Sequence, residues 1–291
     1  FGAIYRQVIY SLMEQVLSKI SRNLYVIPGG FFVTKLFRKL YGSSKKEGDW
    51  RVFIFRGVAM KVDIAKQMGN AIYWRGAHDW APIFVLEKYL KTGDTFIDVG
   101  ANQGEYSLWA ARKVGTNGKV VSFEPMPQLF DQLTANIRLN ESFQKTISPV
   151  KLGLSDKKGE VTLYASEDSN EGTNTIYNTD KFSIELGKIQ LDTLDEQIEE
   201  LKINKVNFLK IDVEGAELQV LKGALNTLKK HLPILLLEIN KDACIAGGYL
   251  PEDILELLKP FNYSFSKIGL RGSLNKVDTL PDFCNILATP L

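Results

Sequence analysis

The sequence predicts an α/β protein with a mostly parallel sheet, helices on both faces of the sheet, and an N-terminal extension of helices and a β-hairpin. Three observations support this prediction. From about residue 79 onward, short apolar runs alternate with helical segments. A loop containing glycines joins the first apolar run to the helix that follows it. Residues 1 to about 45 lack the alternation and carry apolar residues at helical spacing instead. We therefore expect an extension over residues 1–78 and a main domain over residues 79–291.

The extension begins with a predicted amphipathic helix from Tyr5 to Ile20, and Pro28-Gly29-Gly30 ends it. A second short helix, both apolar and basic, follows over residues 31–40. One interpretation is a helix pair that makes peripheral contact with a membrane or binds a partner. The alternative, and the more common use of such a pattern, is a helical cap packed on the main domain or on a second copy in a homo-oligomer.

The remaining elements follow from hydrophobic period and turn residues. Residues 51–66 alternate apolar and polar side chains, which predicts a β-hairpin. Two strand-like runs, residues 161–165 and 183–190, enclose a polar stretch (residues 167–181) that is either a mobile loop near the substrate or a surface hairpin. We expect core strands near residues 95–100, 119–124, 147–154, 207–213 and 234–239, helices near 81–90, 104–113, 127–139, 216–229 and 251–259, and a terminal strand pair near 263–269 and 283–289.

Composition excludes several classes of protein. The net charge of +2, from 36 basic and 34 acidic residues, gives no general attraction to nucleic acid. The two cysteines, Cys244 and Cys284, are too few for a disulfide framework and lack metal spacing. No apolar run is long enough for a transmembrane helix, and no signal peptide is visible. We expect a reducing, cytoplasmic setting.

The segment from Asp98 to Ser107, DVGANQGEYS, is the first candidate binding loop. It follows a buried strand and precedes a helix, the position of a nucleotide pocket at the carboxyl end of a parallel sheet. Gly100 and Gly104 allow the backbone to approach a ligand closely. A loop built for phosphate presents N–H groups and no carboxylate. Asp98 at the strand tip therefore favours a ligand with a positive group or hydroxyls.

The second half of the pocket is Glu124-Pro125-Met126, at the end of the next predicted strand. An acid at this place can hold both ribose hydroxyls, and the aliphatic side chains after it can lie against an adenine. The dinucleotide-binding spacing fails, because its second and third glycine positions are Asn102 and Glu105. The expected ligand is a nucleoside without phosphates, and S-adenosylmethionine has the right groups.

The sequence contains three motifs in order: DVGANQGEYS, FEP and LKIDVEGAELQVLKGA (residues 209–224). Together these motifs resemble the FkbM family of S-adenosylmethionine-dependent methyltransferases over about residues 79–228. The resemblance implies a Rossmann-like class I methyltransferase fold over residues 79–291, with seven strands of which the last is antiparallel. It also implies O-methylation of a small-molecule or glycan acceptor, namely a sugar, a polysaccharide unit or a polyketide-like molecule. The family has a glutamate where the shorter Asp79 stands. The cofactor-binding residues expected on these grounds are Asp79, Asp98, Gly100, Ala101, Asn102, Gly104, Ser107, Glu124, Pro125, Met126, Ser155 and Asp156.

The catalytic candidates are Asp212, Glu214 and His78. Asp212 ends the predicted fourth strand beside the first strand, so it should face the methionine end of the cofactor, and Glu214 should lie farther out toward the acceptor. His78 is an alternative base, because its ordinary pKa suits neutral pH. Asp212 with Glu238 and Asn240 could instead form an oxygen-ligand Mg²⁺ site, which the family resemblance does not require.

Two other classes of function stay open at this point. An NAD-dependent oxidoreductase shares the fold, but the glycine spacing argues against it. A non-catalytic binding or scaffold protein is the other alternative, and the intact acids at both strand tips argue against that. A nucleic-acid methyltransferase would need a basic excess and an NPPY-like loop, and the sequence has neither.

Overall fold

The computed structural model describes residues 2–27, 29–42, 46, 48–166 and 174–291. These residues form two compact units, which we describe separately. The first consists of the described residues up to Trp80, and the second of those from Ala81 to Leu291. None of the described helices is long and apolar enough to span a membrane.

The second unit is built around an eight-stranded sheet with the order β12-β11-β13-β10-β9-β3-β4-β5. Five neighbouring strands of it are parallel: β5 (Ile147–Val150), β4 (Lys119–Phe123), β3 (Thr95–Val99), β9 (Phe208–Ile211) and β10 (Ile234–Asn240). β13 (Phe283–Pro290) is antiparallel to β10, so the expected antiparallel last strand is confirmed. β11 (Tyr263–Ile268) pairs with β13. The three-residue β12 (Leu274–Lys276) adds an eighth strand that the resemblance did not imply.

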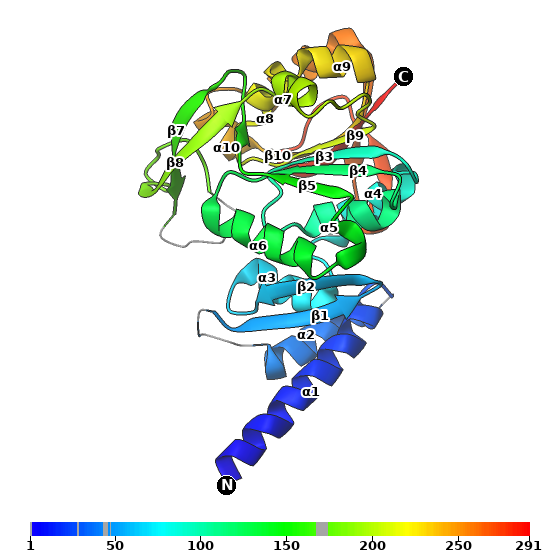
Figure 1. Cartoon of the computed structure of the whole chain (residues 1–291), viewed down its shortest axis with the longest axis vertical. Helices are drawn as coiled ribbons and strands as arrows, with labels where there is room; N and C mark the ends of the chain where they lie inside the picture. Colours follow the sequence, from blue (N-terminus) through cyan, green and yellow to red (C-terminus); the bar gives the residue numbers. More distant parts are fainter. Residues whose placement is uncertain (1, 28, 43–45, 47, 167–173) are drawn as a thin grey trace. The chain divides into compact units, whose positions relative to one another are not determined.

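Helices cover both faces of this sheet, as Figure 1 shows. α5 and α6 lie on one face and α7, α8 and α9 on the other. The interior strands carry apolar side chains that point to both faces and are fully buried, which is typical of a parallel sheet. The helices of this unit are α4 (Trp80–Tyr89), α5 (Glu105–Val114), α6 (Pro127–Arg138), α7 (Leu194–Glu200), α8 (Glu217–Lys222), α9 (Leu225–His231), α10 (Lys241–Ala246) and α11 (Pro251–Leu258).

Two predicted elements are each divided in the structure. The helix expected near 216–229 is interrupted at Gly223, where a Cβ would lie 2.0 Å from the backbone oxygen of Ser155. The backbones approach too closely there for a continuous helix with side chains. The strand expected near 147–154 ends at Val150, and Gly153–Leu154 forms β6 in a different sheet. Both divisions depend on contacts with distant segments.

That second sheet has the order β6-β8-β7. β7 (Gly159–Ala165) and β8 (Ile184–Asp192) are the two strand-like runs of the sequence, and they pair antiparallel. Of the polar stretch between them, residues 167–173 lie outside the described residues, so the interpretation of this stretch as a mobile loop stays a prediction. Both cysteines, Cys244 and Cys284, are free and buried.

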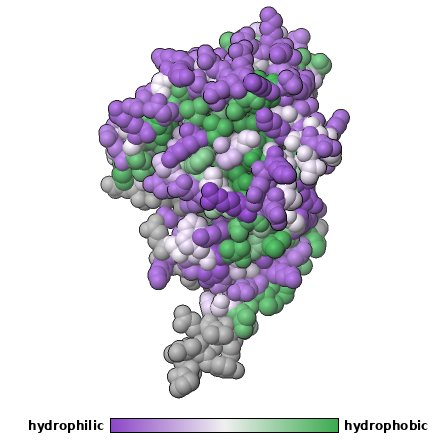
Figure 2. Space-filling view, in the orientation of Figure 1, coloured by the Kyte–Doolittle hydropathy of each residue, from purple (hydrophilic) through white to green (hydrophobic). Residues whose placement is uncertain are grey.

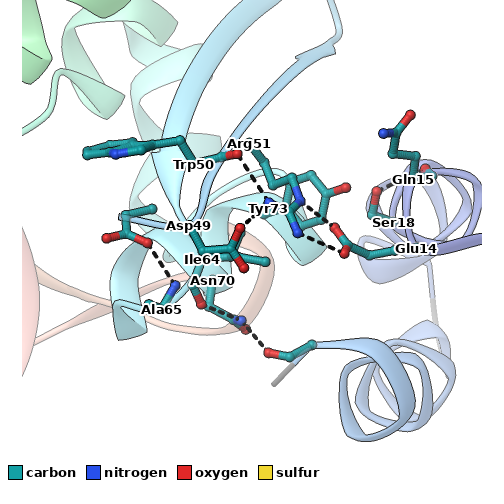
Figure 3. A network of polar contacts seen from close by, with 12 residues as sticks. Glu14, Gln15, Ser18, Asp49, Trp50, Arg51, Ile64, Ala65, Asn70 and Tyr73 are labelled. Atoms are coloured by element: carbon teal, nitrogen blue, oxygen red, sulfur yellow. Dashed lines mark hydrogen bonds and ion pairs between the residues drawn. The ribbon is translucent and has the colours of Figure 1, made fainter. Parts of the chain in front are cut away.

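The first unit contains α1 (Gly2–Tyr25), α2 (Gly30–Tyr41), the hairpin β1 (Trp50–Phe55) and β2 (Val58–Asp63), and α3 (Gln67–Arg75). The helices and the hairpin follow the predicted ranges closely, whereas α3 was not predicted. Polar contacts join these elements, and Figure 3 shows the central group. Arg51 donates to both carboxylate oxygens of Glu14, at 2.8 and 3.0 Å, and also pairs with Asp49. This two-pronged contact ties α1 to β1.

Candidate functional site

Polar side chains lie in one row across three parallel strands of the second unit. Asp98 on β3 is opposite Ser122 on β4 and opposite Lys210 on β9. Because strands in register point corresponding side chains to the same face, these three groups meet beneath the carboxyl ends of the strands. All three residues are buried. The loops that follow these strands carry Gly100 and Asn102, Glu124, and Asp212 and Glu214.

Lys210 is the centre of this row. Its Nζ lies 3.4 Å from Asp98 Oδ1 and 3.3 Å from Asp212 Oδ2, and it donates to the backbone oxygen of Gly100 at 3.0 Å. Burial alone would lower the pKa of Lys210, but the carboxylates of Asp212 and Asp98 outweigh burial and raise it. The side chain is therefore a charged ammonium that connects the ends of β3 and β9.

Asp98 has no exposed surface. Its Oδ2 accepts a 2.6 Å hydrogen bond from Ser107, whose hydroxyl also lies 2.7 Å from the Ser122 hydroxyl. Burial raises the pKa of Asp98 above its ordinary value, and Lys210 and Ser107 act against that rise. The predicted residues Asp98 and Ser107 are thus brought together. The structure uses them to hold the loop start against the sheet, and their contact with a cofactor stays a prediction.

The loop after β3 has the backbone that its sequence indicated. Gly100 has a φ of 75°, and a Cβ there would lie 2.0 Å from the backbone oxygen of Asp212. Asn102 has a φ of 51° and its side chain accepts from the N–H of Gln103, which is a common conformation of asparagine in a tight loop. The N–H groups of Gly100 and Ala101 both donate to the carbonyl of Phe123, which fixes the loop against β4. Gly104, at φ 92°, precedes α5.

Glu124 at the tip of β4 is held by backbone groups. Its Oε2 accepts from the N–H of Asn102 at 2.8 Å, and its Oε1 accepts from the N–H of Met126 at 2.9 Å. Burial raises the pKa of Glu124 to about 7, although the two N–H donors lower it. An ionised carboxylate has about four lone-pair positions, so each oxygen keeps capacity for a ligand hydroxyl. Pro125 and Met126 are partly exposed beside it.

The other predicted cofactor residues, Asp79, Ser155 and Asp156, and the catalytic candidate His78 lie in two places. Ser155 follows β6, is buried, and donates its N–H to the backbone oxygen of Asp192, while the neighbouring Asp156 is exposed. His78 and Asp79 lie between α3 and α4, in the first unit. The roles of these four residues stay predictions.

Three carboxylates meet where β9 and β10 end. One oxygen atom each from Asp212, Glu214 and Glu238 lies within 4.8 Å of the others. Burial raises the pKa of Glu214 to about 8, and the charges of Asp212 and Glu217 contribute. The charge of Asp212 raises the pKa of Glu238 to about 8, with burial and Glu214 adding to the effect. Like charges at this distance disfavour ionisation, so the raised pKa values keep Glu214 and Glu238 largely protonated at neutral pH.

Glu214 is also held in an uncommon backbone conformation, with a φ of 51°. Gly215 after it has a φ of 98°, and a Cβ at Gly215 would lie 2.4 Å from the backbone oxygen of Ala243. Strained non-glycine residues of this kind cluster at functional sites, where the surrounding structure maintains them. All three acids of the cluster are partly exposed.

Glu217 maintains the turn. Its carboxylate accepts from the N–H of Val213 at 3.1 Å and of Gly215 at 3.1 and 3.2 Å, and the hydroxyl of Tyr249 donates to it at 2.7 Å. Glu217 is the first residue of α8. Its side chain is committed to positioning the loop that carries Glu214.

The oxygen-ligand set differs from the predicted one in one member. The side-chain oxygen of Asn240 accepts from the N–H of Ala243 and caps α10, while Glu214 supplies the third oxygen beside Asp212 and Glu238. Three carboxylate oxygens suit a hard divalent cation. They also suit proton transfer, because the raised pKa values of Glu214 and Glu238 allow one of these two groups to accept a proton near neutral pH.

Comparison with known proteins gives consistent matches. The model of the family described as methyltransferase FkbM domain matches residues 98–265. The chain is 33% identical over 211 residues to the hexuronic acid methyltransferase AglP of Haloferax volcanii, covering 72% of this chain and 76% of that protein. It is 30% identical over 162 residues to the methyltransferase sdnD of Sordaria araneosa, covering 46% and 61%. A crystal structure of a methyltransferase FkbM from Methylobacillus flagellatus is 16% identical, with a TM-score of 0.45, and the match covers 99% of this chain and 60% of that one.

We predict that Lys210→Met destabilises the protein by about 3–5 kcal/mol, because it leaves two carboxylates without their buried counter-charge. The measurement is the free energy of unfolding from denaturant titration at neutral pH. Lys188→Met is the matched control, since Lys188 forms an ion pair with Glu160 on the surface. An equal effect of the two substitutions would show that the buried ammonium does not hold β3 and β9 together.

We predict that the ligand-free protein becomes less stable as the pH rises from about 5 to 9. The folded-state pKa values of about 8 for Glu214 and Glu238 lie above the ordinary value of 4.5, so their protonated forms favour the folded state. This contribution is complete below the ordinary value and is lost as the pH rises through about 8. Glu238→Gln should make the loss shallower and raise stability at high pH. Identical pH profiles of the melting temperature for the two proteins would contradict this.

Proposed function

Because the chain belongs to the FkbM family of S-adenosylmethionine-dependent methyltransferases, we propose that it transfers a methyl group to a hydroxyl oxygen of a sugar. The observation that carries the proposal is Glu214, a carboxylate of raised pKa on a strained turn beside two other acids. An alcohol acceptor must lose a proton when its oxygen is methylated, and a group of this kind can take it. Membership in a methyltransferase family removes the alternative of an NAD-dependent oxidoreductase.

The cofactor site that we propose lies at the tips of β3 and β4. Glu124 fits the ribose, because its two oxygens are fixed by backbone N–H groups and keep lone pairs for two hydroxyls. The partly exposed Pro125 and Met126 fit an adenine face. The amino-acid end then lies toward Asp98, Gly100 and Asp212. When bound, S-adenosylmethionine supplies an electrophilic methyl group on a sulfonium sulfur.

In this proposal the residues of the chain align the acceptor with the methyl group and accept the proton of the acceptor hydroxyl. In this proposal Glu214 accepts the acceptor hydroxyl proton, and Asp212 is held in place by Lys210 and keeps the negative potential that raises the pKa of its neighbours. Glu217 and Tyr249 fix the turn from beneath. Fixed placement of this kind is the larger part of catalysis in a displacement reaction, because the reacting atoms must lie in line.

The sugar acceptor is proposed from the relative that methylates a hexuronic acid, according to its name, and that shares 33% of its residues with this chain over the matched region. A polysaccharide unit and a polyketide-like hydroxyl are the other acceptors to be compared. A panel of a hexuronic acid glycoside, a neutral hexose glycoside and a simple polyketide alcohol, assayed with S-adenosylmethionine carrying a labelled methyl group, distinguishes among the three.

We predict that Glu124→Gln weakens S-adenosylmethionine binding by about 10- to 100-fold, the worth of charge-assisted hydrogen bonds to two hydroxyls. Wild-type affinity should rise from pH 5.5 to pH 8, because ligand hydroxyls bind the ionised carboxylate and its pKa in the free protein is about 7. The pH dependence should be flatter in the variant. Calorimetric titration measures both effects, and the exposed Asp131→Asn is the control. Unchanged affinity in Glu124→Gln would place the ribose elsewhere.

We predict that Glu214→Gln lowers kcat by about 10²- to 10⁴-fold, the usual contribution of a general base. Its affinity for S-adenosylmethionine should stay within a few-fold of the wild type. In the wild type, kcat/KM should rise with pH through about 8, following the pKa of Glu214. The control is Glu252→Gln, which removes an exposed acid from the first turn of α11.

A chelator separates this role from the metal alternative. Methyl transfer that persists in EDTA, with the pH profile intact, supports proton acceptance by Glu214. Activity that EDTA abolishes and Mg²⁺ restores would assign Asp212, Glu214 and Glu238 to a cation instead.

A further inference from the structure

In the first unit, α1 buries polar side chains and exposes apolar ones. Glu14, Ser18, Ser21 and Arg22 are all at most 4% exposed. They are satisfied inside the unit: Glu14 by Arg51, Ser21 by the backbone oxygen of Trp74, and Arg22 by the backbone oxygen of Tyr73. A helix that merely covers a protein core has the opposite pattern. The folding of this unit therefore does not account for the apolar face of α1.

The outward face of α1 carries Leu12, Val16 and Ile20, which are spaced four residues apart and are 57%, 57% and 43% exposed. Residues at this spacing lie above one another on a helix, so they form a continuous stripe. Polar residues, including Lys19, lie along one side of the stripe.

The outward face of α2 is built in the same way. Phe32, Leu36 and Leu40 are 74%, 54% and 56% exposed and again lie four residues apart. Lys35 and Lys39 are exposed beside them, one position earlier on each turn. The buried Thr34 lies on the opposite face of the helix. α2 is thus an amphipathic helix whose lysines lie beside its apolar stripe on the exposed side.

Contacts between the helices hold α1 and α2 side by side. The Tyr10 and Tyr41 rings lie 4.8 Å apart, the Tyr41 hydroxyl lies 3.7 Å from the Met13 sulfur, and Ser21 donates to Thr34 at 2.9 Å. The helices therefore pack antiparallel along their length, next to the exposed stripes rather than over them. Figure 2 shows hydrophobic surface exposed on this unit. We name Leu12, Val16, Ile20, Phe32, Leu36 and Leu40 the outer stripe.

The charge around the outer stripe has one sign. Residues 10–42 contain five basic residues and one acidic residue, a net charge of +4, whereas the whole chain carries +2. The acidic residue is Glu14, which is buried and paired with Arg51. Among residues 10–42 as the structure describes them, every exposed charged side chain is a lysine. A surface of this kind complements an anionic one and repels a second copy of itself.

We propose that the outer stripe of α1 and α2 docks the protein onto an anionic lipid surface. The apolar side chains insert at the boundary of headgroups and acyl chains, and Lys19, Lys35 and Lys39 contact the negatively charged headgroups. Both contributions are required, because an apolar face of this size alone binds lipid weakly and lysines alone bind it only at low salt. This inference does not depend on the proposed reaction, and it implies that acceptors held at a membrane are accessible to the protein.

The test is co-sedimentation of the full chain with vesicles of phosphatidylcholine, with and without phosphatidylglycerol. We predict binding to the mixed vesicles that is at least about 10-fold stronger than to phosphatidylcholine alone and that weakens as salt is raised. The double substitution Val16→Glu with Leu36→Glu should reduce it at least about 10-fold. Lys35→Glu with Lys39→Glu should do the same. All four positions are exposed, so the folded structure is preserved, and unchanged circular dichroism and melting temperature verify this.

The matched control is Leu270→Glu, an apolar residue that is 90% exposed in the second unit and should leave vesicle binding unchanged. Three results would overturn the proposal. The first is no binding of the wild type to mixed vesicles, and the second is binding that both double variants retain. The third is a wild-type dimer in analytical ultracentrifugation that the Val16→Glu with Leu36→Glu variant no longer forms, while neither protein binds lipid. The last result would assign the outer stripe to self-association.

Discussion

The arrangement of the site depends on one buried cation. Lys210 extends from the interior of β9 and meets Asp98 of β3, Asp212 beyond its own strand, and the carbonyl of Gly100. A lysine is costly to bury unless its charge is compensated, and here two carboxylates and a carbonyl compensate it. The same contacts fix the relative positions of the two strand ends, where one loop carries the proposed cofactor residues and the other carries the acids. The residues that we propose for binding and for chemistry are thereby placed side by side.

The acids that gather around this cation are held against their mutual repulsion. Asp212, Glu214 and Glu238 lie within a few ångströms of one another, and Glu217 clamps the turn between them with two backbone N–H groups and Tyr249. The left-handed backbone of Glu214 and the burial that raises its pKa both cost stability. The packed apolar side chains of the strands beneath offset this cost. The cost falls on the residue that we propose as the proton acceptor, and shifted pKa values of this kind are typical of catalytic sites.

Much of this could be predicted from local sequence, and the rest depended on contacts between distant segments. The strands, the glycine loop and the conformation of Asn102 follow from short patterns, because a buried strand and a left-handed turn each have their own residue signature. Lys210 was missed, although a lysine inside the apolar run FLKI was a visible signal. The division of α8 from α9 and the role of Glu214 beside Glu238 depend on how β9 and β10 align, which no local pattern encodes. The positions of the N-terminal helices were predicted. The burial of polar side chains on α1 was not, because it depends on partners outside the helix, such as Arg51 of the hairpin for Glu14.

The central claim is that the tips of β3, β4 and β9 form one pocket for a nucleoside with an amino-acid end, with Glu214 facing the reacting sulfur. The most direct test is a crystal structure of the protein with S-adenosylhomocysteine, the demethylated product. We predict the two ribose hydroxyls on Glu124, the amino-acid end beside Gly100 and Asp212, and the Glu214 carboxylate open to the space beyond the sulfur. Ribose density away from Glu124, or a Glu214 side chain turned away from the ligand, would contradict this account.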